Sequence, residues 1–315
     1  MTHTLPQNNT DSSSSSSRFP LLKSRWMGGA LAALLMVAFQ APTESSASLV
    51  AIDDFNSYVA GSDVGGQNGG TGWAYAWTVG SGIDVHQVSS KAVTYTLGDF
   101  TYGGGNSLMF TGGSTQNSTQ RATFTSADQS GQTYYSSFVF TIEGPTGEET
   151  GTATGNNTIS MLAKGNNFSA TTDNALFVNG ANSKTQARNS DQLASVDTLI
   201  QYGVTYLAVV RYSGWDATAG VYETTTVWLN PTTTDENTSD AAIVASVTTD
   251  NAGSEGFQGL AFRTYFTNSA NKVYIDDLRV GTSWDSVVIP EPGTWAFGLS
   301  AGVLAIALLR RRRRS

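Results

Sequence analysis

The chain has 315 residues, of which 13% are charged and 39% hydrophobic, with no cysteine and two histidines. Without cysteine, disulfides, Cys-ligated zinc and thiol nucleophiles are excluded. Between residues 49 and 289, 9 Lys and Arg stand against 22 Asp and Glu, a balance of −13, and so acidic a surface argues against nucleic acid as a partner.

Residues 1–47 have the pattern of a secretory signal peptide with a long polar n-region. Positive residues between 18 and 25 precede the apolar stretch Met27–Phe39, which is short for a membrane span. Ser45 and Ala47 supply small residues at the −3 and −1 positions, so we predict cleavage after Ala47. The alternative for this segment is an uncleaved membrane anchor.

Residues 48–288 predict one all-β domain. Thr, Tyr, Val and Gly are common, Lys and Glu are scarce, and no stretch has a convincing helical period. Short apolar or alternating runs, separated by Gly, Asn and Ser clusters, predict many strands in a sandwich or barrel. The predicted strands cover residues 49–55, 92–97, 107–111, 120–125, 133–142, 175–179, 204–212, 222–229, 260–266 and 273–281.

The order of these segments resembles the concanavalin A-like, laminin-G-like sandwich domains of exported bacterial proteins. The resemblance is carried by Ile52–Phe55, Tyr206–Val210, Val227–Pro231 and Tyr274–Trp284. It implies an antiparallel jelly-roll β-sandwich over residues 48–288, in which the first and last strands are neighbours. Some members of this class hydrolyse polysaccharides with two carboxylates in the spacing Glu-x-Asp-x-x-Glu.

That catalytic spacing is missing here. Glu143, Glu148 and Glu149 lie in the sequence TIEGPTGEET, where glycine and proline break the strand and indicate a solvated loop. His86 has no identifiable catalytic partner, and we expect it on the surface of a strand. We therefore predict that the protein is not an enzyme.

Two Asp-Asp pairs, Asp53-Asp54 and Asp276-Asp277, lie in the first and last predicted strands. Adjacent strand residues face opposite ways, so one member of each pair is expected to bond a turn while the other faces water. Either pair could contribute to a calcium site, although calcium needs six or more oxygen ligands and no Asp-x-Asp-x-Asp-Gly loop is present. No other cofactor is predicted.

Three aromatic residues alternate in the sequence GWAYAW: Trp73, Tyr75 and Trp77. If this segment is a strand, all three share one face. That face is either a platform for stacking on sugar rings or part of the domain core. Trp215, in a Gly-Trp-Asp loop, is a second candidate for sugar contact, with simple packing as its alternative.

Residues 289–315 contain three features in a fixed order. Pro290, Glu291 and Pro292 come first, and an uncharged apolar stretch that predicts a transmembrane helix follows. A basic cluster then closes the chain and would hold this end of the helix in the cytoplasm. The cluster consists of Arg310, Arg311, Arg312, Arg313 and Arg314.

This tail resembles the PEP-CTERM sorting signal. The resemblance implies an exosortase, a membrane cysteine protease, as the partner that recognises Pro290–Pro292 and processes the tail. It also implies anchoring in the inner membrane at first, and then release to the envelope surface or extracellular matrix, often beside exopolysaccharide. The alternative is an ordinary C-terminal membrane anchor.

Together these features predict an exported cell-surface or matrix protein with a non-catalytic carbohydrate-binding or adhesive module. Two alternatives stay open. One is a purely structural envelope protein, and the other is a polysaccharide hydrolase or lyase, which would need two carboxylates converging in a cleft.

Overall fold

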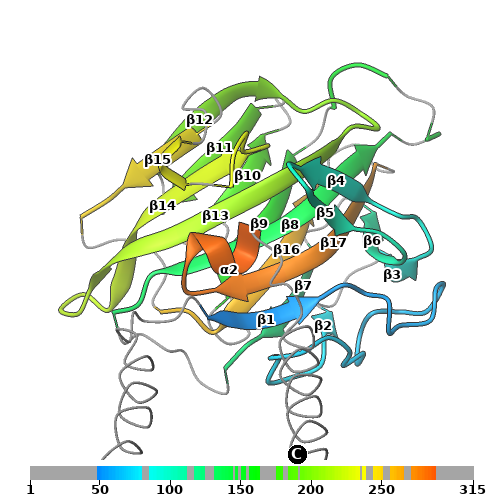
Figure 1. The fold of residues 1–315 in the computed structure, drawn as a ribbon, viewed down its shortest axis with the longest axis horizontal. Coiled ribbons are helices and arrows are strands. Elements are labelled where there is room, and N and C mark those ends of the chain that lie inside the picture. The colour runs from blue at the N-terminus through cyan, green and yellow to red at the C-terminus, as the bar shows by residue number, and fades with distance from the viewer. Residues whose placement is uncertain are drawn as a thin grey trace, which may run out of the picture. The chain divides into compact units, whose positions relative to one another are not determined.

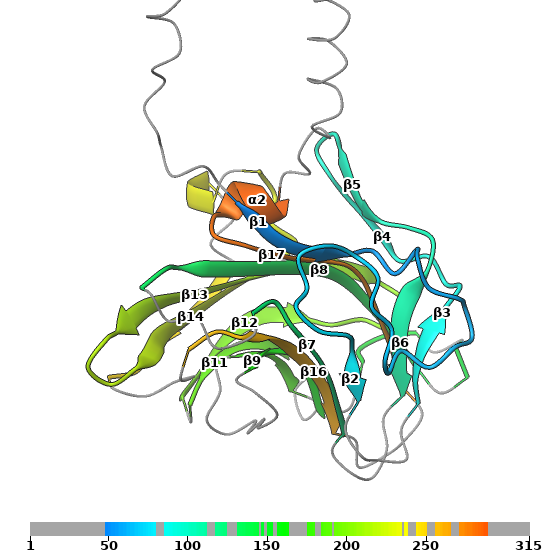
Figure 2. The same ribbon diagram turned by 90° about the horizontal axis from the view of Figure 1, so that it is seen from below.

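The computed structural model describes residues 48–288 apart from 80–84, 112–116, 125–130, 145, 148–149, 154–155, 164–174, 180–183, 191, 235, 239–243, 251–255 and 266–270. These residues form two facing antiparallel β-sheets (Figures 1 and 2). The all-β antiparallel sandwich predicted from the sequence is therefore confirmed.

The larger sheet has eight strands in the order β15-β14-β13-β8-β17-β6-β3, with β1 pairing beside β17. Its strands are β1 (Leu49–Asp53), β3 (His86–Ser89), β6 (Ser107–Thr111), β8 (Tyr134–Glu143), β13 (Thr205–Asp216), β14 (Val221–Leu229), β15 (Val244–Thr248) and β17 (Lys272–Gly281). The pairing of β1 with β17 confirms that the first and last strands are neighbours.

The smaller sheet has seven strands in the order β12-β11-β10-β9-β16-β7-β2. Its strands are β2 (Thr78–Val79), β7 (Asn117–Ala122), β9 (Asn156–Ala163), β10 (Ala175–Asn179), β11 (Lys184–Asn189), β12 (Gln192–Leu199) and β16 (Gly259–Tyr265). Each strand predicted from the sequence has a counterpart in one of these sheets or in the hairpin described below, within a few residues at the ends.

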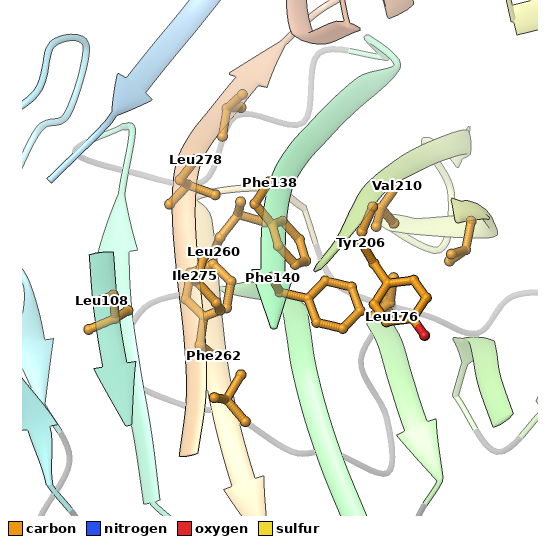
Figure 3. Close-up of a cluster of buried hydrophobic side chains, with 14 of the residues drawn as sticks. Leu108, Phe138, Phe140, Leu176, Tyr206, Val210, Leu260, Phe262, Ile275 and Leu278 are labelled. Atoms are coloured by element: carbon orange, nitrogen blue, oxygen red, sulfur yellow. The ribbon is translucent and has the colours of Figure 1, made fainter. Parts of the chain in front are cut away.

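The main core lies between the two sheets (Figure 3). Phe138 and Phe140 of β8 point into it from the larger sheet, and Leu260 and Phe262 of β16 meet them from the smaller one. The rings of Phe138 and Phe262 pack edge to face, with centroids 5.6 Å apart. This interlocking of aromatic side chains from both layers contributes a large share of the buried apolar area.

The outer face of the larger sheet is also covered. The hairpin β4 (Thr94–Leu97) and β5 (Phe100–Gly103) and the short helix α2 (Trp284–Val288) lie on this face (Figure 2). A short 3-10 helix, η2 (Glu236–Thr238), precedes β15 in the chain. Because both faces are covered, β8 and β13 carry continuous runs of buried residues rather than an alternating pattern.

Strand β17 changes its neighbour halfway along one edge. Its residues 272–275 pair with β6, whereas residues 278–281 pair with β1. Asp276 and Asp277 lie at the change, where the register with β8 also shifts. We call this place the seam; the loops that follow β1 and β5 both meet it.

Several predictions concern residues outside those described. They are the signal segment 1–47 with its cleavage site at Ala47, and the tail 289–315 with its sorting motif, helix and arginine cluster. Among the described residues, no helix has the length and apolar character needed to cross a membrane.

Candidate functional site

The loop between β1 and β2 is built around a buried carboxylate. Asp53, the last residue of β1, is 0% exposed. Its Oδ2 accepts hydrogen bonds from the Tyr58 hydroxyl (2.6 Å) and from Trp77 Nε1 (2.9 Å), and its Oδ1 accepts one from the Phe55 backbone N–H (3.1 Å). These three donors offset the cost of burying the carboxylate. Asp53 thus ties both ends of the loop to one point.

Further hydrogen bonds fix the middle of this loop. Ile52 and Thr71 exchange two backbone hydrogen bonds of 3.0 and 2.9 Å, and the indole N–H of Trp73 donates to the same Ile52 carbonyl at 3.0 Å. The Gly69 N–H donates to the Tyr58 hydroxyl at 3.0 Å. Because the loop is held along its length, its side chains are presented in a defined geometry.

The three alternating aromatic residues do not share one face. The segment from Gly72 to Trp77 forms no strand, so the alternation that would align them is missing. Trp77 is 2% exposed and belongs to the core, whereas Tyr75 is 49% exposed and Trp73 is partly buried. For Trp77 the structure supports the core alternative rather than sugar contact, and its buried indole N–H donates to Asp53.

Trp77 packs against Trp73 and against two aromatic residues of the core. Its ring packs against Phe55 (5.8 Å between centroids) and Phe262 (6.2 Å), and Trp73 packs against it at 6.4 Å. Trp73 and Tyr75 remain at the surface, and we call this pair the aromatic ledge. The indole N–H of Trp73 is already bonded to the backbone, so Trp73 could contact a ligand only through its ring.

The seam contains a second set of buried carboxylates. Asp276 Oδ2 accepts a hydrogen bond from the Gly104 N–H (2.7 Å) and its Oδ1 accepts one from the Asp277 N–H (2.6 Å). Asp277 forms a bidentate ion pair with Arg279 at 2.8 and 3.0 Å and also accepts the Gly103 N–H at 3.2 Å. The carboxylates thus anchor the Gly-rich turn after β5.

The two Asp-Asp pairs differ from one another. Asp53 is buried and Asp54 is exposed, as the strand alternation predicted. Asp276 and Asp277 are both buried, which corrects the expectation that one of them faces water. The reason is the irregular register of β17: Asp277 has a left-handed backbone (φ 49°), which turns its carboxylate toward Arg279.

The environment of Asp276 disfavours its charged form. Burial raises the pKa of Asp276 to about 8, and the nearby charges of Asp277 and Asp54 add to this, while the N–H groups of Gly104 and Asp277 oppose it. Arg279 is held by the bidentate pair with Asp277 and makes no hydrogen bond to Asp276.

The calcium prediction gains no support from this geometry. Within the described ranges, no three His, Cys, Asp or Glu side chains gather in a way that could hold a metal ion. The carboxylate oxygens of Asp53 and Asp277 accept hydrogen bonds from protein donors instead.

Other candidate residues have structural partners. Glu143 does not lie in a solvated loop, because it ends β8 and forms an ion pair with Lys91. His86 is buried rather than exposed and packs against Phe110; burial lowers its pKa to about 4, against the opposing charge of Asp63. Glu148 and Glu149 lie outside the described residues.

Trp215 lies near the end of β13, away from the ledge in the chain. Its ring packs against Tyr222, with centroids 5.0 Å apart, and it is partly buried against the core. The packing alternative accounts for this residue.

Sequence reasoning did not identify the residues that hold the ledge in place, namely Asp53, Tyr58 and Ile52. The Asp-Asp pair at the end of the first strand was the available signal. By itself that pair indicates a turn or a calcium ligand, because the indole and the phenol that bond Asp53 lie 24 and 5 residues further along the chain.

No protein-family model matches this chain, and no curated protein matches it. Solved structures with a similar β-rich fold include a botulinum neurotoxin type C structure from work on its interaction with two ganglioside molecules (TM-score 0.39, 9% identity, 76% of this chain and 48% of that one). This chain spans about half the length of the botulinum structures that it matches.

Two further structures match over nearly their whole length. One is a protein of unknown function from Shewanella oneidensis MR-1 (TM-score 0.40, 10% identity, 84% of this chain and 96% of that one). The other is a conserved carbohydrate esterase from the Shiga toxin-encoding bacteriophage phi24B (TM-score 0.35, 9% identity, 75% and 99%). Such distant likenesses carry no information on ligand or activity.

Proposed function

We propose that the β-sandwich is a non-catalytic carbohydrate-binding module of an exported cell-surface or matrix protein. The observation that supports this most directly is the aromatic ledge, a partly exposed Trp73 and an exposed Tyr75 on a loop fixed by a buried carboxylate. The C–H edges of a sugar ring are apolar, and aromatic rings present a flat, rigid surface for them. We assign the domain to the concanavalin A-like jelly-roll class as part of this proposal.

Polar side chains near the ledge complement such stacking. Thr71 and Asn68 are exposed on the same loop, and the Thr71 N–H meets the Trp73 indole at the Ile52 carbonyl. Hydroxyl and amide groups are suited to the hydroxyls of a sugar. The loop thus combines an apolar surface with neutral hydrogen-bonding groups, which is the combination that sugar sites require.

The non-catalytic part of the proposal rests on the carboxylates. Asp53, Glu143 and Asp277 each bind a protein donor or cation, whereas a glycosidase needs two carboxylates that converge on the substrate. A purely structural envelope protein would bind no glycan, and the experiment below separates it from the proposal.

The test is binding of the full-length chain, in a detergent without sugar groups, to a panel of immobilised polysaccharides. The proposal predicts that wild type binds at least one of them and that Trp73→Ala abolishes binding with the fold intact. Trp73→Phe keeps an aromatic face and should retain part of the affinity, and Trp215→Ala is the matched control away from the ledge. Binding to no glycan, or equal binding by Trp73→Ala, would refute the module.

Export and sorting are a separate part of the proposal, and they rest on the sequence at both ends. An exosortase-type protease is the proposed partner, the inner membrane is the first location, and exopolysaccharide is the proposed surrounding. Replacing Glu291 by Ala should leave an unprocessed, membrane-bound form, visible on an immunoblot of fractionated cells. Normal release of that variant would count against the assigned motif.

A further inference from the structure

The loop that carries the aromatic ledge has no positive charge. Residues 48–79 contain no Lys, Arg or His, and their three ionisable acids are Asp53, Asp54 and Asp63. Asp53 is buried and accepts three protein hydrogen bonds, whereas Asp54 and Asp63 are exposed. The charges that solvent meets on this loop are therefore negative.

Three cations elsewhere in the described sandwich have acidic partners. Lys91 pairs with Glu143, Arg211 with Glu236 and Arg279 with Asp277. The balance of −13 between residues 49 and 289 adds a negative field to that of the loop. A uronate or sulfate brought to the ledge would meet like charge and no cation from the loop itself.

The binding groups on the ledge are neutral. Trp73 has its N–H bonded to the backbone, so it can contact a ligand only through its ring. Tyr75 adds a second ring and a hydroxyl, and Thr71 and Asn68 add neutral polar groups. Carboxylate recognition in proteins is usually supplied by Arg or Lys, and this loop contains neither.

We infer that the aromatic ledge selects neutral glycan chains and disfavours chains that carry uronate or sulfate groups. This inference rests on the proposed carbohydrate-binding function and adds the class of ligand. Its physical basis is the combination of ring faces, neutral polar groups and exposed acids on one loop. In a matrix, the protein would then associate with neutral polysaccharide.

The experiment compares one polymer in two charge states. The full-length chain is first tested against β-glucan, mannan, xylan and galactan, and one neutral polysaccharide that it binds is chosen. That polymer is oxidised at C6 if its sugar has a primary hydroxyl, and is sulfated if it does not. Affinity for the charged form should fall roughly five- to tenfold at low salt and recover in part at high salt, because screening shortens the reach of the repulsion. Equal or tighter binding of the charged form would overturn the inference.

A substitution within the ledge gives the second arm. Ala74 is exposed between Trp73 and Tyr75. Ala74→Lys should restore binding of the charged polymer, whereas Ala74→Gln, of similar length but neutral, should not. If both variants behave alike, charge at the ledge does not set the selectivity and the inference fails.

The outcomes also separate this inference from the function on which it rests. Binding of only anionic polymers, lost in Trp73→Ala, would leave a carbohydrate-binding module and refute neutral selectivity. Binding of no polymer, or binding that is insensitive to Trp73→Ala, would refute the module itself.

Discussion

Asp53 and Asp276 are both fully buried carboxylates, yet their surroundings differ. Asp53 accepts from an indole, a phenol and a backbone N–H, which come from the loop that carries the aromatic ledge. Asp276 accepts only backbone N–H groups and has acidic neighbours. The first carboxylate is thus stabilised in place by side chains, and the second is disfavoured in its charged form.

Asp53→Asn should destabilise the domain. An amide keeps one acceptor oxygen but turns an NH₂ group toward donors, which leaves buried donors without acceptors. The expected loss in the free energy of unfolding is roughly 2–3 kcal/mol, measured by urea denaturation. Asp54→Asn, at the exposed neighbour, should change it by no more than about 0.5 kcal/mol. Similar losses in both variants would show that Asp53 does not organise the loop.

The raised pKa of Asp276 predicts that the free energy of unfolding depends on pH. Its pKa is raised from 3.8 to about 8 by folding, so between these values the folded state binds more protons than the unfolded state. Its stabilising contribution is full below about pH 4 and is lost as pH rises toward 8, by at most about 1.4 kcal/mol per pH unit. Asp276→Asn should flatten the dependence of unfolding free energy on pH between 5 and 8, in buffer with a chelator. Parallel curves for both proteins would contradict the assignment.

At the scale of elements, the seam is the place where strand β17, the ledge loop and the turn after β5 are joined. Strand β17 exchanges β6 for β1 as its neighbour, and there the side-chain carboxylates of Asp276 and Asp277 accept hydrogen bonds from the N–H groups of Gly104 and Gly103. Asn56, at the start of the ledge loop, also donates to the Gly104 carbonyl and accepts from the Asn106 N–H. The ledge loop and the hairpin are therefore fixed to the same part of the sheet.

Substitution of two glycines in the hairpin β4–β5 tests the close packing at the seam. Gly103 and Gly98 both have left-handed backbones (φ 70° and 59°), but a Cβ at Gly103 would lie 2.0 Å from the Val93 carbonyl oxygen, whereas nothing lies within 4 Å of one at Gly98. Gly98→Ala should cost about 1 kcal/mol from backbone strain alone. Gly103→Ala should cost about 1–3 kcal/mol more because of the steric overlap. Chemical denaturation of the two variants provides the comparison, and equal costs would contradict the packing at the seam.

At the scale of the whole domain, the most apolar strands were predictable from the sequence, and several polar ones were not. Strands such as β8 and β13 follow from their runs of Phe, Val and Tyr. Strands β11 and β12 were missed, because KTQARN and QLASVDTL carry no alternation strong enough to indicate a strand. Their assignment depends on the pairing of β11 with β10 and of β12 with β11, which are tertiary contacts.

The candidate site was predictable in composition but not in geometry. The sequence identified the three aromatic residues and both Asp-Asp pairs. It could not show that the indole of Trp77 would be buried in the core, bonded to Asp53, while Trp73 and Tyr75 lie at the surface. That division depends on a hydrogen bond between residues 24 positions apart, which no local period encodes.

We propose that Trp73 and Tyr75 form a ligand-contacting surface, while Trp77 lies in the core. Hydroxyl-radical footprinting of the full-length chain, read by mass spectrometry with and without a bound neutral polysaccharide, tests both parts together. We expect strong labelling of Tyr75, weaker labelling of Trp73 and almost none of Trp77 in the free protein. Polysaccharide should then protect Tyr75 and Trp73 and leave Trp215 unchanged. Labelling of Trp77 as fast as that of Tyr75, or a bound polysaccharide that protects neither ledge residue, would contradict it.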